Sequence, residues 1–341
     1  MRAVVAQRGR LRLEEVAEPT PGEGEVLVAS LATGICGSDL RVLDRQAAAG
    51  EGPALVLGHE FCVEVLAYGP STEPTVPVGA AACRVPFVGG SDGPEVVGLH
   101  PDRPGALAER FVLPAMGLVA VPAGVDPVHA ALTEPLAVGI HAVARAQARG
   151  GSGPYLVVGC GPVGLAVIVA LRQVGAGPVI ASGHGAARRA AAARVGADVV
   201  VDPNERSPFA AWADLGATAV PPPPLRGDGP EPRRPVIFDC AGSDGLLARL
   251  LDAAVPGTHL VVVGAATGVE PIHPALAVRK DLSVDFVLGY TPADFSRSLE
   301  RIATGAVDVA PLISSVVDVG DVTEIEARLR SRDDVKFIVA T

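Results

Sequence analysis

The feature that most constrains the fold is a glycine-rich loop between two apolar segments. The strand-like run YLVV at 155–158 leads into GCGPVG at 159–164, and an apolar helical pattern follows at once. In a strand–loop–helix unit, one glycine makes a tight turn, the next lets the backbone approach a pyrophosphate, and the third lets the helix meet the strand. The helix N-terminus then attracts the anion. The residues expected to contact a dinucleotide are Gly159, Gly161, Pro162, Val163 and Gly164.

Strand and helix patterns alternate around this loop, from about residue 127 to residue 275. The strands are apolar throughout, which is typical of a parallel sheet covered by helices on both faces. Before residue 126, short β-like runs are separated by glycine and proline turns and show little helical periodicity, which predicts an irregular, mostly antiparallel β domain. A chain of 341 residues has room for two such domains. The predicted fold is α/β, with a doubly wound domain over 127–275 and a β domain over 1–126 that is completed by 276–341.

The charge and the cysteines limit the partners and the compartment. The formal net charge is −10, from 38 acidic and 28 basic side chains, so the field of the protein repels a polyanion such as nucleic acid. The N-terminal residues contain no signal-peptide core, and the most apolar stretch, 155–171, is broken by glycine and proline, so we expect no membrane partner. Five scattered cysteines without a CxxC pair are typical of a reducing compartment, which predicts a cytoplasmic protein.

The second strand of the doubly wound pattern ends where an NAD site usually presents a carboxylate to the adenine ribose. The sequence has Gly183 and His184 at this point, with Arg188 and Arg189 on the following helix. The missing carboxylate removes repulsion against a 2′-phosphate, and His184 or Arg188 can pair with that phosphate. These arginines can equally form a solvated surface. The pattern favours NADP over NAD.

Residue types suited to a metal occur in and near the first domain. Cys36 lies beside a glycine turn in TGICGSDL, and His59 and Glu60 lie at a predicted strand end in LGHE. A further carboxylate, Glu134 in ALTEPLAV, lies where the two domains should meet. Thiolate, imidazole and carboxylate can form a tetrahedral zinc shell that leaves one position open for catalysis. Taken singly, such residues more often belong to the core or the surface, so the hypothesis depends on their convergence.

Six motifs give the sequence a resemblance to a known family. TGICGSDL, GHE, PGALAERFVLP, TEPLAVGIHAV, VVGCGPVGL and PVIFDCAGS occur in the order and rough spacing of the zinc-dependent medium-chain dehydrogenases, over nearly the whole chain. The sequence looks most like their polyol branch, typified by sorbitol dehydrogenase, in which a glutamate replaces a cysteine at the EPLAV motif. The resemblance implies a GroES-like catalytic domain, a Rossmann domain and a cleft between them.

The resemblance implies a ligand set for one catalytic zinc ion. Cys36 and His59 would hold the ion together with Glu60 or Glu134, and water would fill the remaining place. Which of the two glutamates is the direct ligand is left open by the sequence. Cys36, His59 and Glu60 are also the expected catalytic residues, since the ion that they hold would carry the chemistry.

The resemblance also implies roles for residues around the metal and the cofactor. Ser38 would be the hydroxyl that relays the proton, and Asp39 would accept a hydrogen bond from His59 and so orient it. The backbone at Val263 and Gly264, at the end of a later parallel strand, is a candidate to bind the nicotinamide carboxamide. Lys336 is a candidate to contact the pyrophosphate.

The sequence departs from the family pattern in three places. The structural zinc of the family needs four closely spaced cysteines in the region after Cys83, and the stretch PFVGGSDGPEVVGLHPDRPG contains none. We therefore expect one zinc ion per chain. The histidine that often relays the proton, five residues after the zinc cysteine, is Arg41 here. The usual ribose-binding acid is replaced by Gly183.

These observations predict a zinc-containing, NAD(P)-dependent oxidoreductase that moves a hydride between a polyol, sugar or secondary alcohol and the nicotinamide. One alternative is a zinc-free quinone or enone reductase on the same scaffold, which would not need the metal residues. Another is a non-catalytic NADP(H)-binding sensor, which would show no turnover. The partner is then a small-molecule alcohol or carbonyl compound. Family habit suggests a homodimer or homotetramer, formed by pairing of the Rossmann sheets at THLVVVG and LSVDFVLG.

Overall fold

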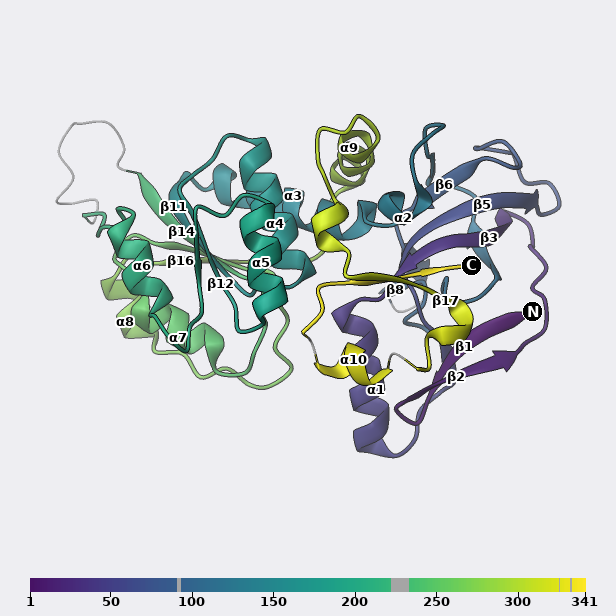
Figure 1. Ribbon diagram of the computed structural model, residues 1–341, viewed down its shortest axis with the longest axis horizontal. Coiled ribbons are helices and arrows are strands. Elements are labelled where there is room, and N and C mark those ends of the chain that lie inside the picture. Colours follow the sequence, from purple (N-terminus) through teal and green to yellow (C-terminus); the bar gives the residue numbers. More distant parts are fainter. Residues whose placement is uncertain (91–92, 222–232, 325, 332) are drawn as a thin grey trace. The chain divides into compact units, whose positions relative to one another are not determined.

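The computed structural model describes residues 1–90, 93–221, 233–324, 326–331 and 333–341 (Figure 1). It divides into two compact units. Unit 1 comprises Met1–Glu134 and Phe295–Thr341, and unit 2 comprises Pro135–Asp294. The chain passes between the units within the helices α3 (Thr133–Ala148) and α9 (Pro292–Ala303).

Unit 2 is built on a six-stranded parallel sheet with the strand order β13-β12-β11-β14-β15-β16. This is the order 3-2-1-4-5-6 of a doubly wound dinucleotide-binding domain, which confirms the predicted fold class. The order reverses between β11 and β14, and the glycine-rich loop follows β11 at that point. The strands are β11 (Gly151–Val158), β12 (Val179–Ser182), β13 (Val199–Val201), β14 (Arg234–Asp239), β15 (His259–Val262) and β16 (Ser283–Phe286).

Helices cover both faces of this sheet (Figure 1). On one face, α6 and α7 pack on alternate strand residues such as Leu156 and Ile237. On the other face, α4 begins at Pro162 beside Val157, and its residues 164–171 are all buried, as expected for a helix that is apolar on every side. The helices of unit 2 beyond α3 are α4 (Pro162–Gln173), α5 (Ala186–Arg194), α6 (Pro208–Asp214), α7 (Leu246–Ala253) and α8 (Pro274–Arg279).

Unit 2 differs from the predicted doubly wound domain at its C-terminal boundary. The domain predicted from the sequence spans 127–275, whereas unit 2 spans Pro135–Asp294. Strand β16 therefore lies within unit 2, where it forms the outer edge of the parallel sheet. The strand itself, LSVDFVLG, was expected from the sequence, but pattern alone does not assign a strand to one sheet rather than another.

Unit 1 is a mostly antiparallel β structure, as its turn-rich sequence predicted. Seven strands form the main sheet, in the order β10-β6-β5-β3-β18-β17 with β9 also pairing with β3. Strands β2-β1-β4 form a second sheet, and β7 and β8 form a hairpin. The strands are β1 (Arg2–Gln7), β2 (Arg10–Glu15), β3 (Glu25–Gly34), β4 (Leu55–Val56), β5 (Glu60–Tyr68), β6 (Ala81–Arg84), β7 (Phe87–Gly90), β8 (Gly93–Val96), β9 (Arg110–Pro114), β10 (Leu118–Ala120), β17 (Ser315–Asp318) and β18 (Phe337–Ala340).

The sequence patterns did not predict the first helix of unit 1. Helix α1 (Gly37–Ala49) begins after Cys36, whose backbone and side chain take part in a capping box with Asp39, and ends at Gly50 in the left-handed conformation. Its buried positions are Asp39, Val42, Leu43 and Gln46. Because two of these four are polar, the helix has a weak apolar periodicity. The other helices of unit 1 are α2 (Pro127–Ala130) and α10 (Glu326–Ser331), with short 3₁₀ segments at Ala310–Leu312 and Val319–Asp321.

The C-terminal strand β18 lies in the middle of the main sheet of unit 1. It pairs in antiparallel fashion with β3, where Ile338 faces Gly34, and in parallel with β17. The last strand of the chain thus lies beside β3, which comes from the first tenth of the sequence. Within the part of the chain that the structure describes, no helix has the length and apolar character that crossing a membrane requires.

Candidate metal and cofactor sites

Cys36, His59 and Glu60 come together in unit 1. Their ligand atoms all lie within 4.8 Å of one another. Strand β3 ends just before Cys36, and β5 begins at Glu60, which faces Gly34 in the antiparallel register. This pairing of one strand end with the start of another is what gathers residues that lie more than twenty positions apart.

Two neighbours of Cys36 orient His59. The buried carboxylate of Asp39 accepts a hydrogen bond from the backbone N–H of Cys36 at 2.8 Å, and its other oxygen lies 3.3 Å from Nδ1 of His59. On the opposite side of the ring, the hydroxyl of Ser38 lies 3.2 Å from Nε2. Burial by itself lowers the pKa of His59, but the charges of Asp39 and Cys36 outweigh it and raise that pKa well above its usual value.

Glu60 has a partner that the sequence analysis did not find. The ammonium group of Lys336 contacts Oε2 of Glu60, and both side chains are buried. Burial opposes the charge on Lys336, but the charges of Glu60 and Cys36 raise its pKa above the usual value. Gly34 leaves space for Glu60, since a Cβ there would overlap its carboxylate. Lys336 is therefore buried inside unit 1. The pyrophosphate contact suggested from the sequence needs an accessible side chain, so that prediction is wrong.

The glycine-rich loop of unit 2 has the close approaches that its mechanism requires. Gly159 has φ +100°, and a Cβ at Gly164 would overlap the carbonyl oxygen of Gly159, so the helix could not meet the strand. Gly161 is the N-cap of α4, and Pro162 is its first residue, followed by Val163. The space beside Gly161 is open, and the nearest atom to a Cβ there is Nη1 of Arg188 at 3.7 Å. Backbone N–H groups of the first helical turn are thus free to face an anion.

Two neighbouring arginines after β12 have different surroundings. Arg189 donates to the carbonyl oxygen of Gly183 at 2.8 Å and pairs with Asp202 at 2.8 Å, so it holds the end of the strand in place. Arg188 lies on the side of the glycine-rich loop, near Gly161. His184 lies on the surface, with Nδ1 3.3 Å from the amide nitrogen of Asn204. The sequence did not single out Asp202, whose only signal is its place directly after β13.

Val263 follows β15 at the same end of the parallel sheet. Its N–H and that of Gly264 both donate to the carbonyl oxygen of Asp239, at 2.9 and 2.8 Å. A contact between Val263 and a carboxamide would therefore use the carbonyl oxygen of Val263 as an acceptor. Asp239 is buried, which raises its pKa, and it accepts hydrogen bonds from two backbone N–H groups of its own loop.

Comparisons with known proteins agree with this geometry. Residues 22–123 match the family described as alcohol dehydrogenase GroES-like domain, and residues 162–304 match the family described as zinc-binding dehydrogenase. The L-threonine 3-dehydrogenase of Pyrococcus horikoshii is 32% identical over 319 residues, which cover 89% of this chain and 86% of that protein. The chain belongs to the zinc-dependent medium-chain dehydrogenases.

Further relatives support this family assignment. The sorbitol dehydrogenase of Ovis aries is 29% identical over 326 residues, covering 91% of this chain and 88% of that protein. A solved zinc-binding dehydrogenase of Sinorhizobium meliloti bound to NADP superposes with a TM-score of 0.82 at 27% identity, covering 100% of this chain and 99% of that one. The resemblance found in the sequence is thus confirmed, as is its consequence that this dehydrogenase is an NAD(P)-dependent oxidoreductase.

In this dehydrogenase, Glu134 lies outside the group formed by Cys36, His59 and Glu60. It is in the first turn of α3, and its charge adds to the rise in the pKa of Lys336. The charge of Glu134 therefore acts on Lys336, but its carboxylate is not one of the three grouped ligand atoms.

The segment after Cys83, which lacks the cysteines of the structural zinc that the resemblance implies, contains the antiparallel strands β7 and β8. Arg103, beyond the hairpin, pairs with Glu95 of β8 at 2.8 Å. Among the described residues, the hairpin and the turn after it do not gather three potential metal ligands.

Proposed function

We propose that this dehydrogenase oxidises a secondary alcohol, polyol or sugar, or reduces the matching carbonyl compound, using one zinc ion held by Cys36, His59 and Glu60. The observation that carries the proposal is the convergence of these three side chains to within 4.8 Å. A thiolate, an imidazole and a carboxylate suit zinc, and three protein ligands leave a fourth position for substrate. We take Glu60, not Glu134, as the carboxylate ligand because Glu60 lies within this group.

The position of Asp39 beside His59 also suits a zinc site. Nδ1 of His59 and Oδ1 of Asp39 are buried and lie 3.3 Å apart without a full hydrogen bond, an arrangement that fixes the ring when the other nitrogen binds a metal. When bound, zinc would make the hydroxyl of an alcohol more acidic and polarise a carbonyl. Ser38, beside His59, would accept the proton that the substrate loses and pass it outward.

The proposal is tested by metal analysis and cofactor reduction. Purified protein should contain about one zinc ion per chain, and it should reduce NADP or NAD, followed at 340 nm, with members of a panel of polyols, sugars and secondary alcohols. Turnover with zinc absent and a quinone as acceptor would instead identify a zinc-free reductase. Tight cofactor binding without turnover on any substrate would identify a sensor.

The preferred cofactor is proposed to be NADP. Support comes from the position of Arg188 beside the glycine-rich loop and from the absence of an acidic side chain at Gly183. A hydrogen bond to a charged group contributes about 1.5–3 kcal/mol. Arg188→Ala should therefore raise KM for NADP by roughly tenfold or more and leave KM for NAD nearly unchanged.

Arg189→Ala is the matched control for that variant. Arg189 is engaged by Gly183 and Asp202, so its loss should affect both cofactors alike through the shape of the loop. Equal changes in the two KM values for Arg188→Ala, measured by initial rates, would contradict the proposed role of Arg188.

The oligomer is proposed to form along β16. This strand is the edge of the parallel sheet, and large apolar side chains are exposed on and beside it, namely Val278, Phe286 and Leu288 at 80%, 70% and 84%. An exposed edge strand with apolar neighbours is a common interaction surface. Light scattering should give the mass of a dimer or tetramer, and a monomer at micromolar concentration would refute the proposal.

The compartment is proposed to be the cytoplasm. The cysteines Cys36, Cys62, Cys83, Cys160 and Cys240 are all unpaired thiols, a state that a reducing compartment maintains. Detection of the protein in a periplasmic or secreted fraction would contradict this.

A further inference from the structure

Lys336 is a buried cation that the proposed chemistry does not use. It directly precedes β18, it is 1% exposed, and its ammonium group contacts Oε2 of Glu60. The same group lies 3.4 Å from the carbonyl oxygen of Ile35, the residue before Cys36. Lys336 thus contacts both segments that carry the metal ligands, the one that follows β3 and the one that begins β5.

Backbone pairing fixes Lys336 in this position. The N–H of Ile35 donates to the carbonyl oxygen of Phe337 at 3.0 Å, so the residue after Lys336 is tied to the residue after β3. Strand β3 in turn lies between β18 and β5, with Gly34 opposite Glu60. The main chain therefore places the ammonium group and the carboxylate against each other.

The carboxylate of Glu60 is within reach of two cations. It is one of the three side chains whose ligand atoms lie within 4.8 Å of one another, and it is also the ion-pair partner of Lys336. A divalent ion held by this carboxylate would be a near neighbour of the ammonium group. Repulsion between like charges is strong where both are removed from water. Either cation stabilises the buried carboxylate, but the two oppose each other.

Two opposite effects on zinc binding follow from these contacts. Lys336 links Ile35 to Glu60 and so helps to hold the ligands in place, which favours the ion. Its positive charge disfavours the ion. One hydrogen bond changes an equilibrium constant by about fivefold, whereas a buried charge a few ångströms from a divalent ion changes it by considerably more. We therefore expect the charge effect to be the larger one.

We propose that Lys336 is a positioning residue that shares Glu60 with the zinc ion and limits the affinity of the site for zinc. The inference rests on the proposed function, since it takes Cys36, His59 and Glu60 as the ligands. With Lys336 as its partner, Glu60 stays paired when the ion leaves. The ion can then exchange without leaving a buried carboxylate uncompensated.

The test is the zinc affinity of the full-length, zinc-loaded enzyme, measured by transfer of zinc to a chelator of known affinity. Lys336→Gln removes the charge and keeps a group that can donate to Glu60 and to Ile35. It should bind zinc about tenfold or more tightly than the wild type, because a neutral amide does not repel the ion. A purely structural lysine predicts the reverse, since its loss would loosen the ligand segments. An affinity equal to or below that of the wild type would overturn the inference.

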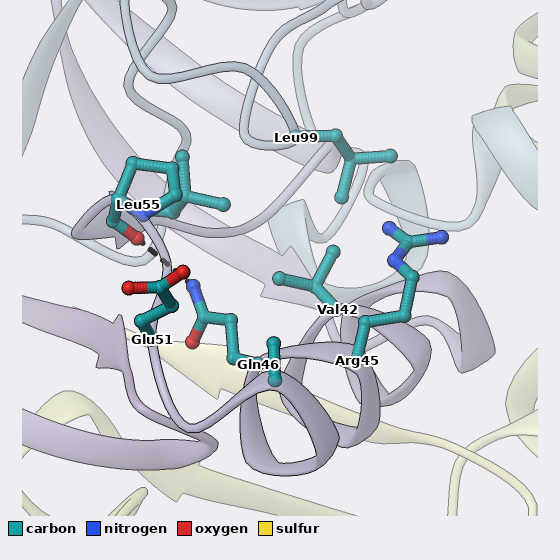
Figure 2. Close-up of a pocket in the computed structure, with 8 residues that line it drawn as sticks. Val42, Arg45, Gln46, Glu51, Leu55 and Leu99 are labelled. Carbon is teal, nitrogen blue, oxygen red and sulfur yellow. Dashed lines mark hydrogen bonds between the residues drawn. The ribbon is translucent and has the colours of Figure 1, made fainter.

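Two further variants test whether charge at this position is the cause. Lys336→Arg retains a positive charge and should not gain affinity, so a gain equal to that of Lys336→Gln would contradict the inference. Figure 2 shows Arg45 on α1, where it lines a groove of about 290 Å³ that the metal ligands do not line. Arg45→Gln removes this exposed charge from unit 1, and its zinc affinity should stay within about twofold of the wild type. A gain as large as that of Lys336→Gln would show that the overall charge of unit 1, and not the contact with Glu60, controls the affinity.

The wild-type chain allows a measurement that needs no variant. Labelled lysine gives two side-chain NMR signals, because Lys336 and Lys280 are the only lysines of the chain. Lys280 lies in unit 2, where its ammonium group donates to the carbonyl oxygens of Asp252 and Ala254. Removal of zinc by the chelator should shift the Lys336 signal and leave the Lys280 signal in place. If the Lys336 signal does not move, its ammonium group does not share a carboxylate with the ion, and the inference is wrong.

The chelator measurements separate this inference from the proposed function. If the wild type holds about one zinc ion per chain and Lys336→Gln holds it with the same affinity, only the role of Lys336 is refuted. If the wild type holds no zinc but Lys336→Gln does, the inference is supported and the proposed zinc-dependent function is refuted. Absence of zinc from both proteins would refute both.

Discussion

Replacing Cys36 with serine is expected to abolish turnover while the cofactor still binds. The variant loses the only thiolate of the three-ligand group, and a serine hydroxyl is a poor ligand for zinc at neutral pH. Zinc content should fall from about one per chain to nearly none, and kcat/KM should fall by about 10³-fold or more, since the ion supplies several kcal/mol of transition-state stabilisation. The affinity for NADP should change little, because the glycine-rich loop lies in unit 2.

Cys240→Ser is the control for this experiment. It makes the same chemical change at a thiol of unit 2 outside the metal group, so zinc content should stay at the wild-type level. Metal analysis, steady-state rates and fluorescence titration with NADPH give the three readouts. Full activity in Cys36→Ser would remove the basis of the zinc proposal, and loss of NADP binding together with activity would point to misfolding.

Replacing Lys336 with methionine is expected to destabilise unit 1 strongly. The ammonium group is the buried partner of Glu60, and both residues are 1% exposed. Removing one partner of a buried ion pair leaves an uncompensated charge and typically costs about 3–5 kcal/mol. In zinc-free protein, the free energy of unfolding of unit 1, measured in urea, should fall by that amount.

The double variant Lys336→Met with Glu60→Gln isolates the cause. A neutral amide next to methionine leaves no buried charge, so the double variant should regain about half or more of the stability lost by Lys336→Met alone. If the free energy of unfolding of Lys336→Met were within about 0.5 kcal/mol of the wild-type value, the ion pair would not contribute to stability. If the double variant were as unstable as the single one, packing and not charge would be responsible.

Local patterns were sufficient to predict a doubly wound domain, although not its boundaries. Apolar strands that alternate with helices leave few other arrangements, and the glycine spacing at 159–164 requires a tight turn against a helix N-terminus. Helix α9 has a clear apolar stripe, formed by the buried side chains of Phe295, Leu299 and Ile302. Helix α1 has no such stripe, because Asp39 and Gln46 occupy buried positions. Periodicity therefore missed the helix that carries Ser38.

The candidate site was predictable as a set of residues but not as an arrangement. Cys36, His59 and Glu60 were proposed from residue chemistry and family resemblance, and the structure places them together. Lys336 was a candidate to contact the pyrophosphate, and nothing in the sequence around it indicates a buried role. Its contact with Glu60 depends on β18 pairing with β3, which joins residues some 276 positions apart.

The dinucleotide loop could be predicted from the sequence alone, because its glycines are close neighbours in the chain, and six motifs spread along the chain predicted the family and the chemical types of the metal ligands. Which carboxylate lies in the group with Cys36 and His59, and which buried partner Lys336 has, follow only from the tertiary structure. Those outcomes depend on strand register, and register is set by packing between distant segments, which short-range patterns do not encode.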